Sequence, residues 1–211
     1  MNKTTRLNAP LALTLLLTLA MGCSTTQPER SQRAVSDLQQ LTKLLTESDT
    51  QIAALNKELR AVSKAKPDDL RDAYADFDKE LQRTQQLAGE VNDLSDDLKN
   101  NAEKYFETWE KQASKLNNSD LKDMSLERQK TLRQEFDRVM AAMDRLAAAY
   151  KSYSTDVKDL QMFLGNDMTR AGSEMAKPQI TKVLAGGDPL QAALRGAQTE
   201  VQSMATILKP K

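Results

Sequence analysis

The sequence predicts an all-α fold, an elongated antiparallel coiled-coil bundle of three long helices followed by short C-terminal helices. Apolar residues recur at heptad spacing over three long stretches, which is the pattern of packed helices and not of strands. Charged residues make up 28% of the chain and aromatic residues only 4%. This composition favours long exposed helices over a thick globular core.

An apolar segment precedes the first heptads. It follows the basic residues Lys3 and Arg6, spans 11 mostly apolar residues and ends at Met21, just before Gly22-Cys23. A basic start, an apolar centre and a small residue at the cleavage point are typical of secretory signals. Eleven residues are too few to cross a bilayer, which takes about 20. We therefore expect residues 1–22 to be a signal peptide.

The only cysteine, Cys23, ends the motif Leu19-Ala20-Met21-Gly22-Cys23, which resembles the lipobox of bacterial lipoproteins. The resemblance implies cleavage after Gly22, a diacylglycerol on the Cys23 thiol and an acyl chain such as palmitate on the new amino terminus. In Gram-negative lipoproteins an Asp after the lipidated cysteine is associated with inner-membrane retention, so Ser24 implies sorting to the outer membrane. We expect a lipid-anchored outer-membrane protein that faces the periplasm, although a cell-surface orientation stays open.

The charge balance and the residue types exclude several function classes. Cleavage would remove Lys3 and Arg6, leaving 28 basic residues against 30 acidic ones. Nucleic acid is therefore not an expected partner, since phosphate binding needs concentrated positive charge. The sequence has no histidine, which excludes Ser-His-Asp, Cys-His and HExxH zinc sites. We expect no catalysis, no cofactor and no metal.

The first predicted helix follows a short polar tether, residues 23–30, and opens a helical bundle domain over residues 31–208. It should run from about Ser31 to Lys64, and Pro67 should prevent its continuation. Its predicted buried seam is Leu38, Leu41, Leu45, Ile52, Leu55, Leu59 and Val62.

The second helix should run from Pro67 or Asp68 to about Leu116, because proline suits a first helical turn and aspartate the positive helix N-terminus. A fold about residue 66 would place Leu55 near Phe77. The predicted seam is Leu70, Tyr74, Phe77, Leu81, Thr84, Ala88, Val91, Ser95, Leu98, Ala102, Tyr105, Trp109, Gln112 and Leu116.

The third helix should begin at about Ser125, after a cluster of turn-forming residues at 117–120, and end at Leu164 before Gly165-Asn166. A fold about residue 120 would place Trp109 near Leu132. The predicted seam is Leu132, Phe136, Val139, Met143, Leu146, Tyr150, Tyr153, Val157, Leu160 and Leu164. The short breaks favour packing within one chain over a coiled coil between chains, and the oligomeric state is left open.

The last part of the chain is predicted to be broken. Gly172 and Pro178 interrupt residues 167–185, which suggests one broken helix or two short ones. Gly186-Gly187 should form a hinge, and Asp188-Pro189 should open a final helix, with aspartate as its N-cap and proline in its first turn.

Two groups of residues are candidates for function. Tyr105, Phe106 and Trp109 form a possible partner surface if they are exposed; the alternative is that they wedge the bundle near a hairpin end. In the heptad frame Tyr105 and Trp109 lie on the seam and Phe106 lies beside it. The carboxylates of Asp72, Asp76 and Glu80 share one helix face but lack the loop of a calcium site, so a solvated face is the preferred interpretation.

One wider resemblance covers about residues 35–208. The segment Tyr105-Phe106-Glu107-Thr108-Trp109-Glu110 and the later segment Phe163-Leu164-Gly165-Asn166-Asp167 resemble a family of uncharacterised bacterial coiled-coil proteins, domain of unknown function 2959. The later segment departs from the family pattern, which carries a Lys-His-Asn that this chain lacks. The resemblance implies an all-helical coiled-coil fold and no assigned activity.

These observations together predict a lipid-anchored cell-envelope scaffold or adaptor that binds other envelope proteins. One alternative is an accessory subunit of an envelope transport or secretion complex. A second is a hydrolase or binding protein with a site between helices, which would require an apolar pocket with convergent polar groups.

Overall fold

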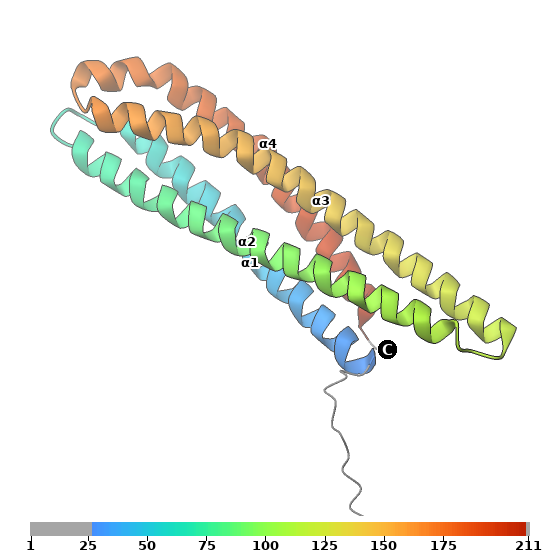
Figure 1. Ribbon diagram of the computed structural model, residues 1–211. Helices are drawn as coiled ribbons and strands as arrows, with labels where there is room; N and C mark the ends of the chain where they lie inside the picture. Colours follow the sequence, from blue (N-terminus) through green and yellow to red (C-terminus); the bar gives the residue numbers. More distant parts are fainter. Residues whose placement is uncertain (1–26, 210–211) are drawn as a thin grey trace, which may run out of the picture.

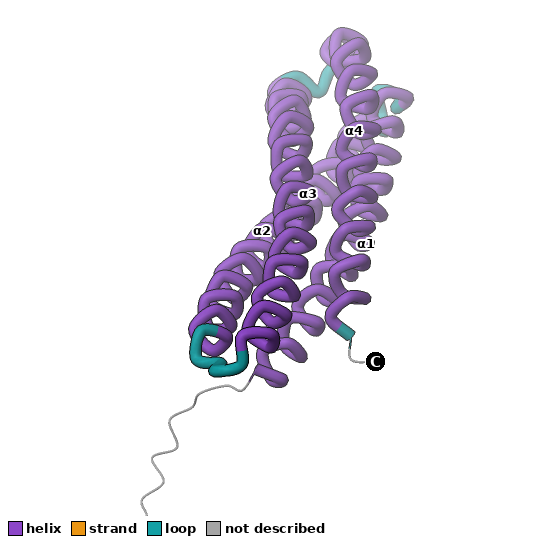
Figure 2. Tube along the Cα trace, turned by 90° about the vertical axis from the view of Figure 1, so that its right-hand side faces the viewer, coloured by secondary structure: helices purple, strands orange, loops and turns teal. Residues whose placement is uncertain are grey.

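The computed structural model describes residues 27–209, with side chains from Gln32 onward, and this part of the chain folds into four long helices (Figure 1). They are α1 (Gln27–Lys64), α2 (Leu70–Ala113), α3 (Ser119–Asn166) and α4 (Arg170–Leu208). Turns join them only at the two ends of the molecule (Figure 2). No strand is present in the described residues, so the predicted all-α class is confirmed.

The four helices alternate in direction around a shared core. α1 packs against α2 and α4, and α3 also packs against α2 and α4, so α1 and α3 are diagonal partners. The contact between α2 and α3 is the least extensive of the four. Figure 1 shows the α2–α3 turn reaching beyond the start of α1 and the end of α4. None of these helices is both long and apolar enough to cross a membrane.

The first hairpin matches the predicted register. The Gln51 side chain donates hydrogen bonds to the Glu80 backbone carbonyl at 3.1 Å and to the Glu80 carboxylate at 2.6 Å, which corresponds to a fold about residue 66. All seven predicted seam residues of the first helix are buried. α1 starts at Gln27, inside the segment expected to be a tether, and Pro28 suits its first helical turn.

The second hairpin has a different register from the predicted one. α3 begins at Ser119 and not at Ser125, because Asn118 acts as the N-cap and its side-chain oxygen accepts a hydrogen bond from the Leu121 N–H at 3.0 Å. The fold centre therefore moves to about residues 117–118. Accordingly, the Gln129 amide reaches the Phe106 carbonyl at 2.7 Å.

The predicted short C-terminal helices are wrong, because α4 is one continuous helix of 39 residues. Pro178 and Pro189 lie inside it with exposed side chains, where water can pair the carbonyl that each proline leaves free. Gly186-Gly187 is not a hinge. A heptad stripe outweighs the local glycine and proline preferences: Ala176, Ile180, Val183, Gly187, Leu190, Leu194, Ala197, Val201 and Met204, all buried.

Gly187 allows α1 and α4 to approach closely. A Cβ atom at this position would lie only 2.6 Å from the Asn56 side-chain nitrogen. The Asn56 oxygen in turn accepts a hydrogen bond of 2.8 Å from the Tyr153 hydroxyl of α3. This buried pair crosses the core between the diagonal helices.

Candidate functional site

Cys23, the predicted lipid attachment residue, lies outside the described residues. α1 begins at Gln27, only four positions later. The start of α1, the α2–α3 turn and the end of α4 all lie at one end of the molecule (Figure 1), which we name the proximal end. The distal end carries the α1–α2 and α3–α4 turns.

The predicted aromatic group packs mainly between α2 and α3 near the proximal end. Phe106 is only 3% exposed, and its ring centroid lies 6.1 Å from that of Phe136 on α3. Tyr105 and Trp109 are half-buried and stack edge to face at 5.5 Å. The Trp109 indole N–H donates to the Ser125 hydroxyl at 2.8 Å, and burial raises the pKa of the Tyr105 hydroxyl. Only the outer parts of Tyr105 and Trp109 are therefore accessible to a partner.

The predicted heptad frame of the second helix is wrong over its last part. Phe106 and Ala113 are buried there, whereas Gln112 and Leu116 are exposed. Beyond Leu98 the buried positions of α2 shift by one residue, to Phe106 and Ala113. Phe106 packs there on Phe136 of α3.

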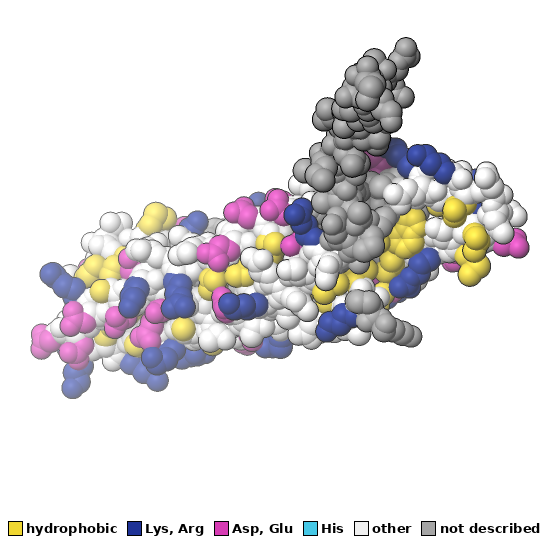
Figure 3. Space-filling view, turned by 90° about the horizontal axis from the view of Figure 1, so that it is seen from below, with side chains coloured by type: hydrophobic (Ala, Val, Ile, Leu, Met, Phe, Trp, Pro, Cys, Tyr) yellow, Lys and Arg dark blue, Asp and Glu magenta, His cyan; other side chains and the backbone are white. Residues whose placement is uncertain are grey.

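The exposed large apolar side chains of the described residues all lie at the two ends of the bundle. Three surround the α2–α3 turn: Leu116, Leu121 and Met124. Four surround the α3–α4 turn: Met162, Phe163, Met168 and Met175. We call the second group the distal patch. Acidic and basic side chains are interspersed along the face shown in Figure 3.

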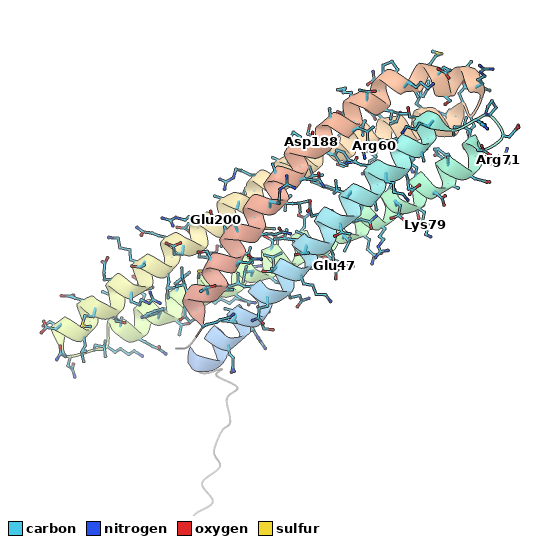
Figure 4. All side chains as sticks on the ribbon, turned by 180° about the vertical axis from the view of Figure 1, so that it is seen from behind. Glu47, Arg60, Arg71, Lys79, Asp188 and Glu200 are labelled. Atoms are coloured by element: carbon cyan, nitrogen blue, oxygen red, sulfur yellow. The ribbon has the colours of Figure 1, made fainter. Side chains whose placement is uncertain are left out.

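Charged side chains along the flanks of the described helices lie on the outer faces. Arg60 on α1, Lys79 on α2 and Asp188 on α4 illustrate this placement (Figure 4). Within residues 27–209, no group of three or more His, Cys, Asp or Glu side chains could hold a metal ion. Of the acidic face considered for calcium, the Glu80 carboxylate is occupied by the Gln51 amide.

A cavity of about 260 Å³ opens between α2 and α3 at mid-length. Sequence reasoning missed this cavity, although it considered a site between helices. Its floor is formed by buried side chains of the two opposite helices, Ile52 on α1 and Leu190 and Leu194 on α4. We call it the lateral cavity.

A second cavity of about 480 Å³ lies at the proximal end, between the start of α1, the end of α4 and α2. Its lining is more polar and includes Arg33, Asp37 and Tyr105. Burial raises the pKa of the Asp37 carboxyl. The positive charge of Arg33 lowers this pKa in part, and the negative charge of Asp97 raises it further.

Comparison with known proteins places the chain in a family. Residues 26–183 match the family described as "Protein of unknown function (DUF2959)", and the chain belongs to this family. The resemblance noted in the sequence is thus confirmed. No curated protein and no solved structure gives a significant match.

Proposed function

We propose that this member of the DUF2959 family is a lipid-anchored scaffold or adaptor of the cell envelope, which acts by binding proteins and not by catalysis. Cys23 attaches it to the outer membrane, and the bundle extends into the periplasm. The helices pack as an antiparallel coiled coil, which makes the bundle a rigid spacer.

The observation that carries this proposal is the distal patch. Met162, Phe163, Met168 and Met175 are exposed at the end opposite the start of α1, and Met175 is 70% exposed. Large exposed apolar groups that gather in one place mark interaction sites, and flexible methionines adapt to a partner surface.

The length of the bundle holds the distal patch away from the membrane anchor. α1 has 38 residues, which corresponds to about 57 Å at the helical rise. A protein anchored near Gln27 would hold its distal patch about that far from the membrane surface. Separating an anchor from a binding surface is the property expected of a scaffold.

Site-specific photocrosslinking in cells tests the binding surface. A photoreactive amino acid at Met162 or Met175 should crosslink one recurring envelope protein, whereas the same amino acid at Ala148, an exposed flank position, should not. Crosslinks from the flank but not from the distal patch would refute the proposal. A stoichiometric membrane complex that co-purifies with the chain would instead favour the accessory-subunit alternative.

Lipidation has its own test. Cys23→Ala should accumulate as an unlipidated precursor, and the wild-type protein should carry the mass of its acyl chains by mass spectrometry. A wild-type protein without that mass would remove the membrane anchor from the proposal and leave the distal patch to be judged by crosslinking.

A further inference from the structure

The lateral cavity is an apolar opening into the core. Its walls include Leu87 and Val91 from α2 and Leu146 from α3, above the floor formed by Leu190 and Leu194. Its volume of about 260 Å³ lies just below the ~300–1,000 Å³ found for ligand pockets. Such a space suits one acyl chain and not the two chains of a phospholipid.

Small residues on facing helices produce this space. In the register set by the Gln129–Phe106 hydrogen bond, Ala88 on α2 lies opposite Ala147 on α3, and both line the cavity. Large side chains hold the same two helices apart at both ends. Tyr74 reaches across to the Gln161 carbonyl at 3.2 Å, and Phe106 packs on Phe136.

Three polar side chains inside the cavity, those of Ser48, Gln51 and Thr84, are already paired within the protein. The hydroxyls of Ser48 and Thr84 each donate at 2.8 Å to the backbone carbonyl four residues earlier. The Gln51 amide is bound to Glu80. The interior therefore offers an acyl chain apolar contact and offers a polar molecule few free hydrogen-bond donors.

The mouth of the cavity is polar and carries one cation. Asn92, Lys151 and Ser154 line it, and Asn92 and Lys151 are exposed. The Lys151 ammonium forms no ion pair with any side chain among residues 32–209. An apolar interior with a cation at its rim is complementary to a molecule with an apolar chain and an anionic head.

We propose that the lateral cavity binds a single-chain carboxylate amphiphile of the fatty-acid class. The acyl chain enters between α2 and α3 and contacts the leucines of the floor. The carboxylate stays at the mouth beside Lys151. This proposal does not depend on the function proposed above, because it uses neither the lipid anchor nor the distal patch.

Photolabelling of the full-length chain in isolated membranes tests the proposal. The probe is a diazirine derivative of dodecanoate, and unlabelled dodecanoate is the competitor. The label should appear on tryptic peptides that line the cavity, namely residues 84–99 and 146–151 of its walls and residues 183–195 of its floor, and dodecanoate should displace it. Labelling spread evenly over peptides inside and outside the cavity, or labelling that dodecanoate does not displace, would overturn the proposal.

Two pairs of variants separate chain binding from head binding. Ala88→Leu fills the cavity and should abolish the displaceable label, whereas Ala148→Leu, on an exposed position beside the cavity, should leave it unchanged. If Ala88→Leu does not fold, Ala147→Leu at the mouth takes its place. Lys151→Glu should weaken competition by dodecanoate about fivefold, as expected for one exposed ion pair, but not competition by dodecanol.

The matching charge control is Lys158→Glu, on an exposed position of the same helix, which should behave like the wild type. Displaceable labelling that survives both cavity-filling variants would overturn the assignment of the acyl chain. Equal effects of Lys151→Glu and Lys158→Glu would overturn the assignment of the carboxylate. Displacement by a two-chain phospholipid and not by dodecanoate would overturn the single-chain class.

Discussion

The helix pairs α1–α4 and α2–α3 differ in how closely the two helices pack. Along α1 and α4, Gly187 brings the helices together until Asn56 fills the space, and Gln198 reaches Thr46 at 3.4 Å further along. Along α2 and α3, Ala88 and Ala147 face each other and leave the lateral cavity between them.

A small residue therefore has opposite effects in the two places. On the α1–α4 side Gly187 allows α4 to pack closely against Asn56 of α1. On the α2–α3 side the aromatic side chains of Tyr74 and Phe106 act as spacers at the two ends, and the alanines between them cannot draw the helices together. Large side chains elsewhere between two helices therefore determine whether a small residue allows close packing or leaves a cavity.

The largest expected effect contrasts a leucine of the closed side with one of the open side. Leu55 is fully buried, at 0% exposure, whereas Leu146 is 6% exposed and borders the cavity. Leu55→Ala should cost about 3–5 kcal/mol of unfolding free energy and Leu146→Ala about 2–3 kcal/mol, because the latter loses fewer contacts. Urea unfolding of both variants measures the difference. Equal costs would mean that the cavity is closed in solution.

The next effect concerns the hydrogen bond that crosses the core. Tyr153→Phe leaves the buried Asn56 oxygen without its donor, and we expect a loss of about 2 kcal/mol. Tyr150→Phe is the matched control, because Tyr150 is half-buried beside the cavity and forms no hydrogen bond within the described residues. It should be close to neutral. A similar loss for both variants would show that the Tyr153–Asn56 bond contributes little.

The same tyrosine predicts a pH dependence. Burial raises the pKa of the Tyr153 hydroxyl above its ordinary value, which is about 10. A raised folded-state pKa gives stability that is complete below about pH 10 and is lost as the pH rises toward the folded-state pKa. Wild-type unfolding free energy should therefore fall between about pH 9.5 and 11 more steeply than that of Tyr153→Phe. Parallel pH profiles would contradict this assignment.

Alanine substitutions at two neighbouring glycines should change the unfolding free energy by smaller amounts and in opposite directions. Gly187→Ala places a Cβ against Asn56, whose hydrogen bond to Tyr153 resists displacement, so we expect a net loss of about 1–2 kcal/mol. Gly186→Ala meets no atom closer than 3.8 Å and should stabilise α4 by up to about 1 kcal/mol. Thermal unfolding followed by circular dichroism compares them. A loss in both variants would show that Gly186 is also packed too closely to accept a Cβ atom.

Heptad spacing was sufficient to predict which residues of a helix are buried and where the first two helices separate. Nine of the ten predicted seam residues of the third helix are buried and only Tyr150 is half-buried, and Pro67 separates the first two helices as expected. The continuous α4 was missed because glycine and proline were given more weight than the stripe that runs through Gly187. Both the glycine and proline residues and the apolar stripe were visible in the sequence, and the stripe should have been given more weight.

The lateral cavity could not be predicted for a different reason. It depends on Ala88 facing Ala147, whereas the predicted fold about residue 120 would place Ala88 opposite Ser152. The choice of Asn118 and not Ser125 as the N-cap moved the facing residue by about five positions. Likewise, Tyr153 on a buried seam implies a hydrogen-bond partner, but nothing in the spacing identifies Asn56 on the diagonal helix.

The smallest expected effect lies where α2 and α3 do touch. Trp109→Phe removes the hydrogen bond to Ser125, but both side chains are only half-buried, so water can replace the lost donor. We expect a cost of about 0.5–1 kcal/mol, clearly below that of Tyr153→Phe. A double-mutant cycle with Ser125→Ala, followed by circular dichroism, isolates the coupling between the two groups. A coupling as large as that of the Tyr153–Asn56 pair would show that the ends of the α2–α3 contact are tied as firmly as the core, and the cavity between them would then be enclosed by two rigid supports.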